Sequence, residues 1–151
     1  MKIYYTLLII FVVAFIACGK DKFTTEPQVK INSIKPGTVQ SGNIVSMKGE
    51  YTDQEGDLDS ALIVYKWYNG STAVRHDTFR FAFSSLNLPT NTKEAEITVD
   101  FQYNTSNPNG YITLPGVSVR DTTATLGLIL IDKAANRSNY AESDQIRLIK
   151  P

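Results

Sequence analysis

Apolar and polar side chains alternate with a period of two over much of the chain beyond residue 28, and this is the period of a β-strand with one buried face. The cleanest example is the segment 94–103, where Ile97, Val99 and Phe101 share one face and the polar residues between them share the other. Shorter stretches of the same kind are 29–34, 45–51 and 61–68. No long helical period, heptad pattern or internal repeat accompanies them. We therefore expect half-buried strands and no substantial helix.

Two further segments predict strands of a different kind. Phe79, Phe81 and Phe83 alternate with arginine and alanine, which indicates a strongly aromatic strand. We expect these three rings and Trp67 to lie in the core, because large aromatic side chains dominate packing when they are buried. Residues 123–131 are apolar almost without interruption, as in a central strand that is covered on both faces.

Turn-forming sequences divide the chain at short intervals. Lys35-Pro36-Gly37 and Asn69-Gly70 each favour a turn, the second because it suits positive backbone angles. Segment 111–120 indicates a short irregular strand broken at Pro115-Gly116, and segment 146–149 a final edge strand. About seven strands without a convincing helix predict an all-β fold, a single antiparallel β-sandwich.

The chain begins with the features of a secretory signal peptide, which we assign to residues 1–17. Met1-Lys2 supply a positive start, an apolar run follows from Ile3, and the small Ala17 precedes Cys18. The run is shorter than the about 20 apolar residues that a membrane-spanning helix needs. The alternatives are an ordinary signal peptide followed by an incidental cysteine, and a single-pass membrane anchor.

Phe15-Ile16-Ala17-Cys18 resembles the bacterial lipobox, although its first residue departs from the usual leucine. The resemblance implies that Cys18 carries acyl chains such as palmitate and that the polar segment 18–28 is a tether between the lipid and the domain. Gly19-Lys20-Asp21 resembles the export tag of surface lipoproteins in Bacteroidota, and a glycine after the cysteine resembles lipoproteins sent to the outer membrane. We therefore expect a lipid-anchored protein of the outer membrane, facing the cell surface or the periplasm.

The size and charge of the chain limit its class. Removing residues 1–17 from the 151 leaves 134, enough for one domain with a substantial core. Lys2 is the only charged residue removed, so 14 basic residues remain against 15 acidic ones. This near-neutrality argues against a nucleic-acid partner, which normally meets a basic patch. Cys18 is the single cysteine, so no internal disulfide can form.

Three segments resemble immunoglobulin-like modules of the bacterial cell surface, of the polycystic-kidney-type and cadherin-like kinds. These segments are the acidic loop 51–59, the tryptophan-bearing strand 65–67 and the loop 131–138. The resemblance implies an immunoglobulin-like sandwich over residues 29–151, with the two loops at the same end. Ala135 replaces the glycine usual in the second loop, so we expect that loop to differ in conformation.

The acidic loop is the one candidate ion site. Its four carboxylates lie within seven residues: Asp53, Glu55, Asp57 and Asp59. Calcium takes 6 to 8 oxygen ligands, and alternate acids around a glycine let a loop point several oxygens inward. In the arrangement that the resemblance implies, Asp132 adds a carboxylate and Asn136 a side-chain carbonyl. The alternative is a solvated acidic turn, with aspartate and glycine present for the turn geometry.

Catalytic readings find little support. His76 is the only histidine, no Gly-x-Ser-x-Gly sequence occurs, and a zinc site would need several His or Cys ligands. Counting alone does not exclude paired acids for glycoside hydrolysis. We therefore expect a non-catalytic binding or accessory module for an unidentified protein or glycan partner. The alternatives are a small glycan-binding component of a polysaccharide-uptake system, and a secreted enzyme whose acids converge in a pocket away from the acidic loop.

Overall fold

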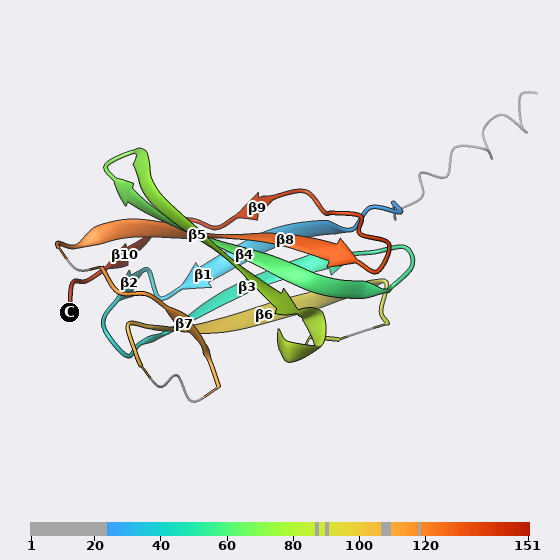
Figure 1. Ribbon diagram of the computed structural model, residues 1–151, viewed down its shortest axis with the longest axis horizontal. Helices are drawn as coiled ribbons and strands as arrows, with labels where there is room; N and C mark the ends of the chain where they lie inside the picture. Colours follow the sequence, from blue (N-terminus) through green and yellow to red (C-terminus); the bar gives the residue numbers. More distant parts are fainter. Residues whose placement is uncertain (1–23, 87, 90, 107–109, 118) are drawn as a thin grey trace, which may run out of the picture.

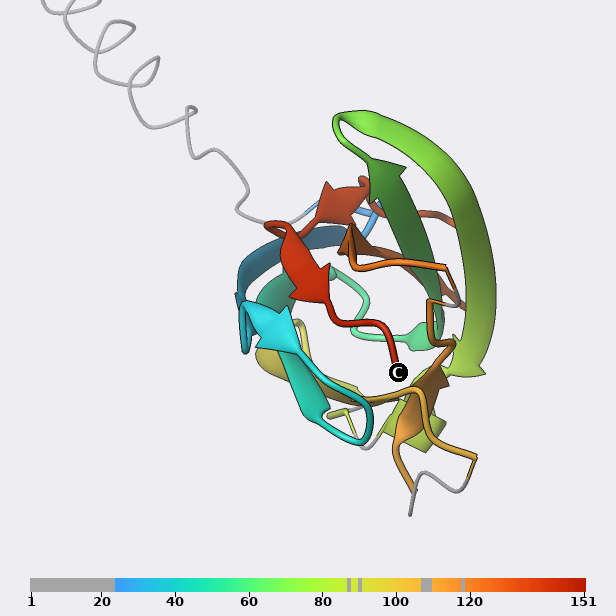
Figure 2. The same cartoon turned by 90° about the vertical axis from the view of Figure 1, so that its left-hand side faces the viewer.

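The computed structural model describes residues 24–86, 88–89, 91–106, 110–117 and 119–151, which form two β-sheets packed face to face (Figures 1 and 2). The predicted signal peptide and Cys18 lie outside these residues. The elements are β1 (Gln28–Lys35), β2 (Thr38–Val39), β3 (Ile44–Thr52), β4 (Leu58–Asn69), β5 (Thr72–Ala82), the 3-10 turn η1 (Phe83–Leu86), β6 (Glu94–Tyr103), β7 (Ile112–Leu114), β8 (Thr122–Asp132), β9 (Ala141–Glu142) and β10 (Ile146–Leu148). No helix among the described residues is long and apolar enough to cross a membrane.

The first sheet has the strand order β1-β3-β6-β7. The predicted alternation is confirmed in its two long central strands. In β3, Val45, Met47 and Tyr51 are buried, and in β6, Val99 and Phe101 are buried, while the residues that alternate with them are more exposed. The inward side chains of both strands therefore build one face of the hydrophobic core.

The second sheet has the strand order β2-β10-β8-β4-β5, with β9 paired to β8 on a separate path. The prediction of a central strand covered on both faces is confirmed for β8. On its inner side Leu126, Leu128 and Leu130 are buried. On its outer side the ring of Tyr140 lies so close to Gly127 that a Cβ there would stand 2.3 Å from it. A glycine at this place lets the loop before β9 cover the strand.

The all-β sandwich is confirmed, but the pairing is not purely antiparallel. β6 pairs with β7 in parallel, and β10 pairs with β2 in parallel. The prediction that the final strand lies at a sheet edge is wrong. After β1 the chain crosses to the second sheet, and Thr38–Val39 lie along the outer side of β10, where the backbone N–H of Ile149 donates to the carbonyl of Val39 at 2.9 Å.

The aromatic segment lies only partly inside the core. Phe83 is buried, whereas Phe79, Phe81 and Trp67 are half-buried and pack against the margin of the core. The reason is the position of β5, which is an edge strand with β4 on one side and none of the described strands on the other (Figure 2). The expectation of a fully buried aromatic group is therefore correct for Phe83 and holds in part for the other three rings.

Candidate metal centre

The β3–β4 loop and the β8–β9 loop lie at the same end of the sandwich (Figure 1). β4 begins beside the end of β8, and Leu58 pairs with Asp132. The two loops also share a backbone hydrogen bond, in which the N–H of Lys133 donates to the carbonyl of Asp57 at 3.2 Å. The antiparallel pairing of β4 with β8 thus brings together two acidic segments that are far apart in the sequence.

Three carboxylates converge where these loops meet. Asp53, Asp57 and Asp132 each offer one oxygen, and the three oxygens lie within 4.8 Å of one another. Asp53 is 0% exposed and Asp132 is 3% exposed, while Asp57 is half-buried. We refer to these three residues as the carboxylate cluster.

Two oxygens of the cluster are buried without a partner among the described residues. Asp53 accepts a hydrogen bond from the backbone N–H of Asp57 at 2.9 Å through Oδ2, but its Oδ1 accepts none. The Oδ1 atom of Asp57 is likewise buried and unpartnered. A buried carboxylate oxygen left in this way is costly unless a hydrogen bond or a metal ion satisfies it.

The electrostatics of the carboxylate cluster also favour a positive charge at this place. Burial raises the pKa of Asp53, and the nearby negative charges of Asp57, Glu55 and Asp132 raise this pKa further, while the N–H of Asp57 opposes the shift. Carboxylates this close repel one another, so the folded protein favours either a bound proton or a bound cation at this place.

Asn136 orients the cluster from the second loop. Its backbone N–H donates to Oδ1 of Asp132 at 2.8 Å, and its side-chain nitrogen donates to Oδ2 of the same residue at 2.8 Å. Ala135 makes this loop possible with a positive φ of 68°, and its N–H donates to the carbonyl of Asp132 at 3.1 Å. The loop therefore keeps the left-handed conformation of a glycine in spite of the alanine. Asn136 thus positions Asp132 through two hydrogen bonds.

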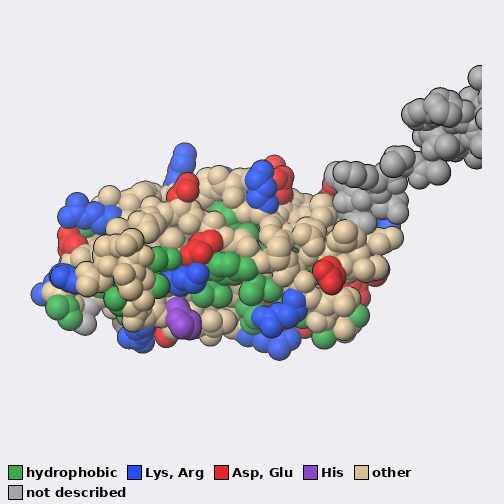
Figure 3. Space-filling model, turned by 90° about the horizontal axis from the view of Figure 1, so that it is seen from above, with side chains coloured by type: hydrophobic (Ala, Val, Ile, Leu, Met, Phe, Trp, Pro, Cys, Tyr) green, Lys and Arg blue, Asp and Glu red, His purple; other side chains and the backbone are tan. Residues whose placement is uncertain are grey.

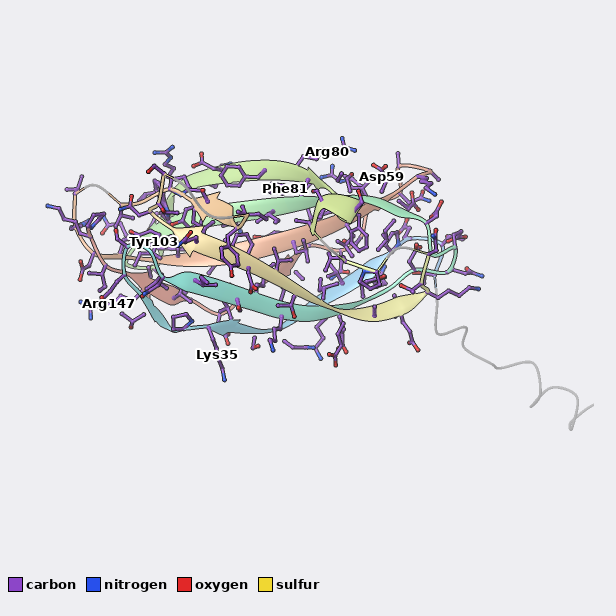
Figure 4. All side chains as sticks on the ribbon, turned by 90° about the horizontal axis from the view of Figure 1, so that it is seen from below. Lys35, Asp59, Arg80, Phe81, Tyr103 and Arg147 are labelled. Carbon is purple, nitrogen blue, oxygen red and sulfur yellow. The ribbon has the colours of Figure 1, made fainter. Side chains whose placement is uncertain are left out.

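The other two predicted ligands lie outside the cluster. Glu55 is exposed, and its negative charge contributes to the raised pKa of Asp53. Asp59 is exposed on β4 and lies 3.7 Å from Arg80, its neighbour in Figure 4. Six residues were expected at this site from the sequence. The structure brings Asp53, Asp57 and Asp132 together and joins Asn136 to Asp132 by hydrogen bonds. Glu55 and Asp59 lie at the surface.

The donor set of the cluster suits a hard divalent cation. It consists of carboxylate oxygens, and the described residues add no histidine to it. Calcium is bound by such oxygens at about 2.3–2.6 Å, and its flexible coordination allows backbone carbonyls and water to complete the set. Zinc would instead prefer nitrogen or sulfur ligands. Binding of the ion itself stays a prediction.

A second polar group, which the sequence did not predict, lies on the outer face of the second sheet. Glu142 on β9 accepts hydrogen bonds from Lys66 at 3.0 Å, from Tyr68 at 3.0 Å and from Thr125 at 2.5 Å. The ammonium of Lys66 also lies 4.6 Å from the ring centre of Tyr140. Its members come from β4, β8 and the β9 region, so no short sequence motif predicts that they lie together. The group is paired internally and fastens β9 onto the sheet.

No family model matches the chain, and no curated protein matches its sequence. Among solved structures, it is similar to the alkylpurine DNA glycosylase AlkC of Pseudomonas fluorescens, with 9% identity and a TM-score of 0.44 over 90% of this chain and 33% of that one. It is similar to the sporulation control protein Spo0M of Bacillus subtilis, with 10% identity and a TM-score of 0.44 over 85% of this chain and 51% of that one. A CARDB domain from Pyrococcus furiosus, solved with di-metal ions, gives 12% identity and a TM-score of 0.33 over 86% of this chain and 95% of that one. The chain thus spans about a third of the first of these proteins and half of the second.

Proposed function

We propose that this protein is a non-catalytic β-sandwich module, stabilised at one end by a bound calcium ion and held at the outer membrane by a lipid on Cys18. It acts as a binding or accessory module for a partner near that membrane. The observation that carries the calcium part is the buried, unpartnered Oδ1 of Asp53 beside the carboxylates of Asp57 and Asp132. The lipid part rests on the sequence around Cys18.

The strand order supports an immunoglobulin-like architecture. Such folds place their first, second and fifth strands in one sheet and their third, sixth and seventh in the other. Here β1, β3 and β6 are neighbours in the first sheet, and β4, β8 and β10 are neighbours in the second. In that scheme the carboxylate cluster joins the loop after the second strand to the loop after the sixth.

The role proposed for the ion is structural. It would link a loop that leaves the first sheet at Thr52 to a loop that leaves the second sheet at Asp132, and so stiffen one end of the sandwich. His76, the one candidate acid–base histidine of the chain, lies on the edge strand β5 opposite Lys66 and not in the cluster. General acid–base chemistry at the cluster would need such a group within reach.

A tether at residues 18–28 would join the sandwich at the end that carries the carboxylate cluster. Gln28 pairs with Thr52, which directly precedes the cluster residue Asp53. The amide of Asn139 holds this end of β1, because it accepts from the N–H of Val29 at 2.9 Å and donates to its carbonyl at 2.8 Å. The opposite end of the molecule, with the β4–β5 hairpin and the C-terminus, would then face away from the membrane (Figure 1).

An enzymatic role finds less support from the structure. A hollow of about 580 Å³ on the outer face of the first sheet includes Glu50 and Glu96, which lie directly opposite each other. The side chain of Glu50 is 53% exposed and lies 3.4 Å from Lys30. A catalytic acid for glycoside hydrolysis needs a sheltered carboxyl, and this one is solvated and ion-paired.

Thermal unfolding of the full-length protein with calcium, with magnesium and with EDTA tests the calcium part. A ligand present at about 100 times its dissociation constant stabilises a protein by about 2.7 kcal/mol, which raises the midpoint of a chain of this size by roughly 5–10 °C. We expect the largest rise with calcium. Equal midpoints with calcium and with EDTA would remove the metal centre from the proposal.

Metabolic labelling with palmitate tests the tether independently. We expect label on the wild-type protein and none on Cys18→Ser. A wild-type protein without label would refute the lipid anchor and leave the metal centre untouched.

A further inference from the structure

A groove of about 480 Å³ lies at the end of the sandwich opposite the carboxylate cluster, between the β4–β5 hairpin and the segment before β8. We call it the distal groove. Its apolar lining includes Val74, Val117 and Val119, and Val119 is 81% exposed. Val74 is 60% exposed, and it has no partner on β4 because the register of β4 and β5 shifts at Trp67. Two exposed valines therefore line the same hollow.

Cationic side chains line the same groove. The guanidinium of Arg75 lies 4.6 Å from the ring centre of Trp67 and pairs with Asp77 at 3.3 Å. Arg120 donates to the side-chain oxygen of Asn69 at 2.7 Å and has no carboxylate partner among the described residues. Figure 3 shows basic and hydrophobic side chains side by side at the left-hand end of the molecule.

The acid next to Arg120 in the sequence does not neutralise it. Asp121 follows it directly in the chain, but its carboxylate accepts from Arg147 at 2.9 Å and from the backbone N–H of Lys150 at 3.0 Å. These bonds lower the pKa of Asp121, so it is ionised and already satisfied. Within the described part of the chain, Arg120 therefore presents a positive charge without a paired acid at the rim of an apolar groove.

We propose that the distal groove binds a polypeptide segment that carries a carboxylate side chain next to an apolar one. A guanidinium recognises a carboxylate through two parallel hydrogen bonds, and an apolar side chain between the valines gains by leaving water. In this arrangement Arg120 takes the carboxylate, and Val74 and Val119 take the apolar side chain.

The same surface disfavours a glycan as the occupant. Sugars stack on free aromatic faces, but Arg75 covers a face of Trp67, and the Tyr65 ring packs against Trp67 at 84° with ring centres 5.3 Å apart. The proposal rests on the proposed function in one respect, the tether, which leaves the distal groove facing away from the membrane and open to a protein partner.

Fluorescence polarisation with labelled synthetic peptides tests the proposal on the full-length chain in detergent. The probe alternates leucine with aspartate. One control peptide alternates serine with aspartate and keeps the charge without the apolar side chains, and a second alternates leucine with lysine. We expect the leucine–aspartate peptide to bind at least about tenfold more tightly than either control, which corresponds to a difference in binding free energy of about 1.4 kcal/mol.

Exposed variants locate the binding. We expect Arg120→Glu to weaken binding of the leucine–aspartate peptide about tenfold or more, and Val119→Ser to weaken it several-fold. Arg137→Glu makes the same charge change on the loop that follows Asp132 and should leave binding unchanged. In the wild-type protein, peptide-induced NMR shifts of backbone amides should gather at residues 69–75 and 119–122, a readout that needs no variant.

Several results would overturn the proposal. Binding would be unspecific charge attraction if the serine–aspartate peptide bound equally well, or if Arg120→Glu and Arg137→Glu lost equal affinity. An unaffected Arg120→Glu variant would show that Arg120 does not bind the carboxylate. Binding of polygalacturonate in place of the peptides would assign the groove to an acidic glycan. Repeating the titration in EDTA and with Cys18→Ser separates these results from a failure of the calcium centre or of the tether, because peptide binding to the distal groove in solution needs neither calcium nor the lipid.

Discussion

The backbone N–H of Lys133 donates to the carbonyl oxygen of Asp57 at 3.2 Å and joins the two loops that form the carboxylate cluster. This bond holds the loops at a fixed separation, so Asp57 and Asp132 face each other in the folded chain without further rearrangement. A cation entering there would meet ligands that are already in place, which reduces the entropic cost of binding.

Asp53→Asn should make the stability of the protein independent of calcium. In EDTA the variant should be about 1–2 kcal/mol more stable than the wild type at neutral pH, because it removes a buried negative charge with an unpartnered oxygen. Calcium should no longer raise its unfolding midpoint. Asp59→Asn is the matched control, since that carboxylate is exposed and lies outside the cluster. Chemical denaturation with and without calcium measures both effects, and a full calcium response in Asp53→Asn would contradict the assignment.

The raised pKa of Asp53 also predicts a pH dependence in EDTA. The folded state holds this proton more tightly than the unfolded state, so the free energy of unfolding should fall as pH rises from below 3.8 through the raised folded value. Asp53→Asn should flatten that part of the profile. Parallel profiles for wild type and variant between about pH 3 and pH 7 would show that burial does not perturb this carboxyl.

Ala135→Gly should stabilise the protein by about 0.5–1 kcal/mol. Ala135 has φ of 68°, where an L-residue with a Cβ is strained by about 1–2 kcal/mol and glycine is not. Ala134→Gly is the control in the same loop, and because Ala134 is not among the positive-φ residues it should lose stability by roughly 0.5–1 kcal/mol. Urea denaturation of the two variants checks the sign, and equal destabilisation of both would contradict the account of this loop.

The strands of the sandwich could be predicted from the sequence because burial on one face leaves a period of two. This holds for Met47 in β3 and Phe101 in β6, both buried as expected. The two-residue β2 carries no detectable period, and for that reason the position of β10 inside the sheet was missed. Edge position is also invisible to periodicity, so the half-buried state of Phe79 could not be foreseen.

The candidate site was predictable only in part, for a related reason. Counting alternate acids treats the loop as if it had a regular direction, but Gly56 takes a φ of 68° and turns the chain within it. Glu55 therefore points away while Asp57 points inward. Asp59 already belongs to β4, where Leu58 is buried and the next residue must face outward. The group around Glu142 joins three separate segments and has no local signal at all.

Glu142→Gln should remove a pH-dependent part of the stability. Burial acts to raise the pKa of Glu142, but hydrogen bonds from Thr125, Lys66 and Tyr68 outweigh burial and lower it below 4.5. The stabilisation is therefore present above pH 4.5 and is lost as pH falls through the lower folded value. We expect the variant to lose about 1–2 kcal/mol at pH 7 and to show a flatter acid limb. Glu26→Gln, at an exposed residue before β1, should behave as the wild type; equal losses in both variants would refute the role of this group.

Tyr103→Phe should cost about 1–3 kcal/mol. The buried hydroxyl of Tyr103 accepts from the N–H of Val117 at 3.1 Å and donates to the carbonyl of Ile149 at 3.2 Å, so its removal leaves a buried N–H without a partner. Tyr111→Phe is the control, because Tyr111 is exposed. Thermal and urea unfolding of both variants measure the difference, and an unchanged Tyr103→Phe protein would show that the hydroxyl is replaceable by water.

Isothermal titration of the full-length protein with calcium tests the metal centre most directly. We expect one ion to bind per wild-type chain at neutral pH, with the binding lost in Asp53→Asn and in Asp132→Asn and retained in Asp59→Asn. Calcium binding that survives Asp53→Asn, or no binding to the wild type at millimolar calcium, would contradict the account.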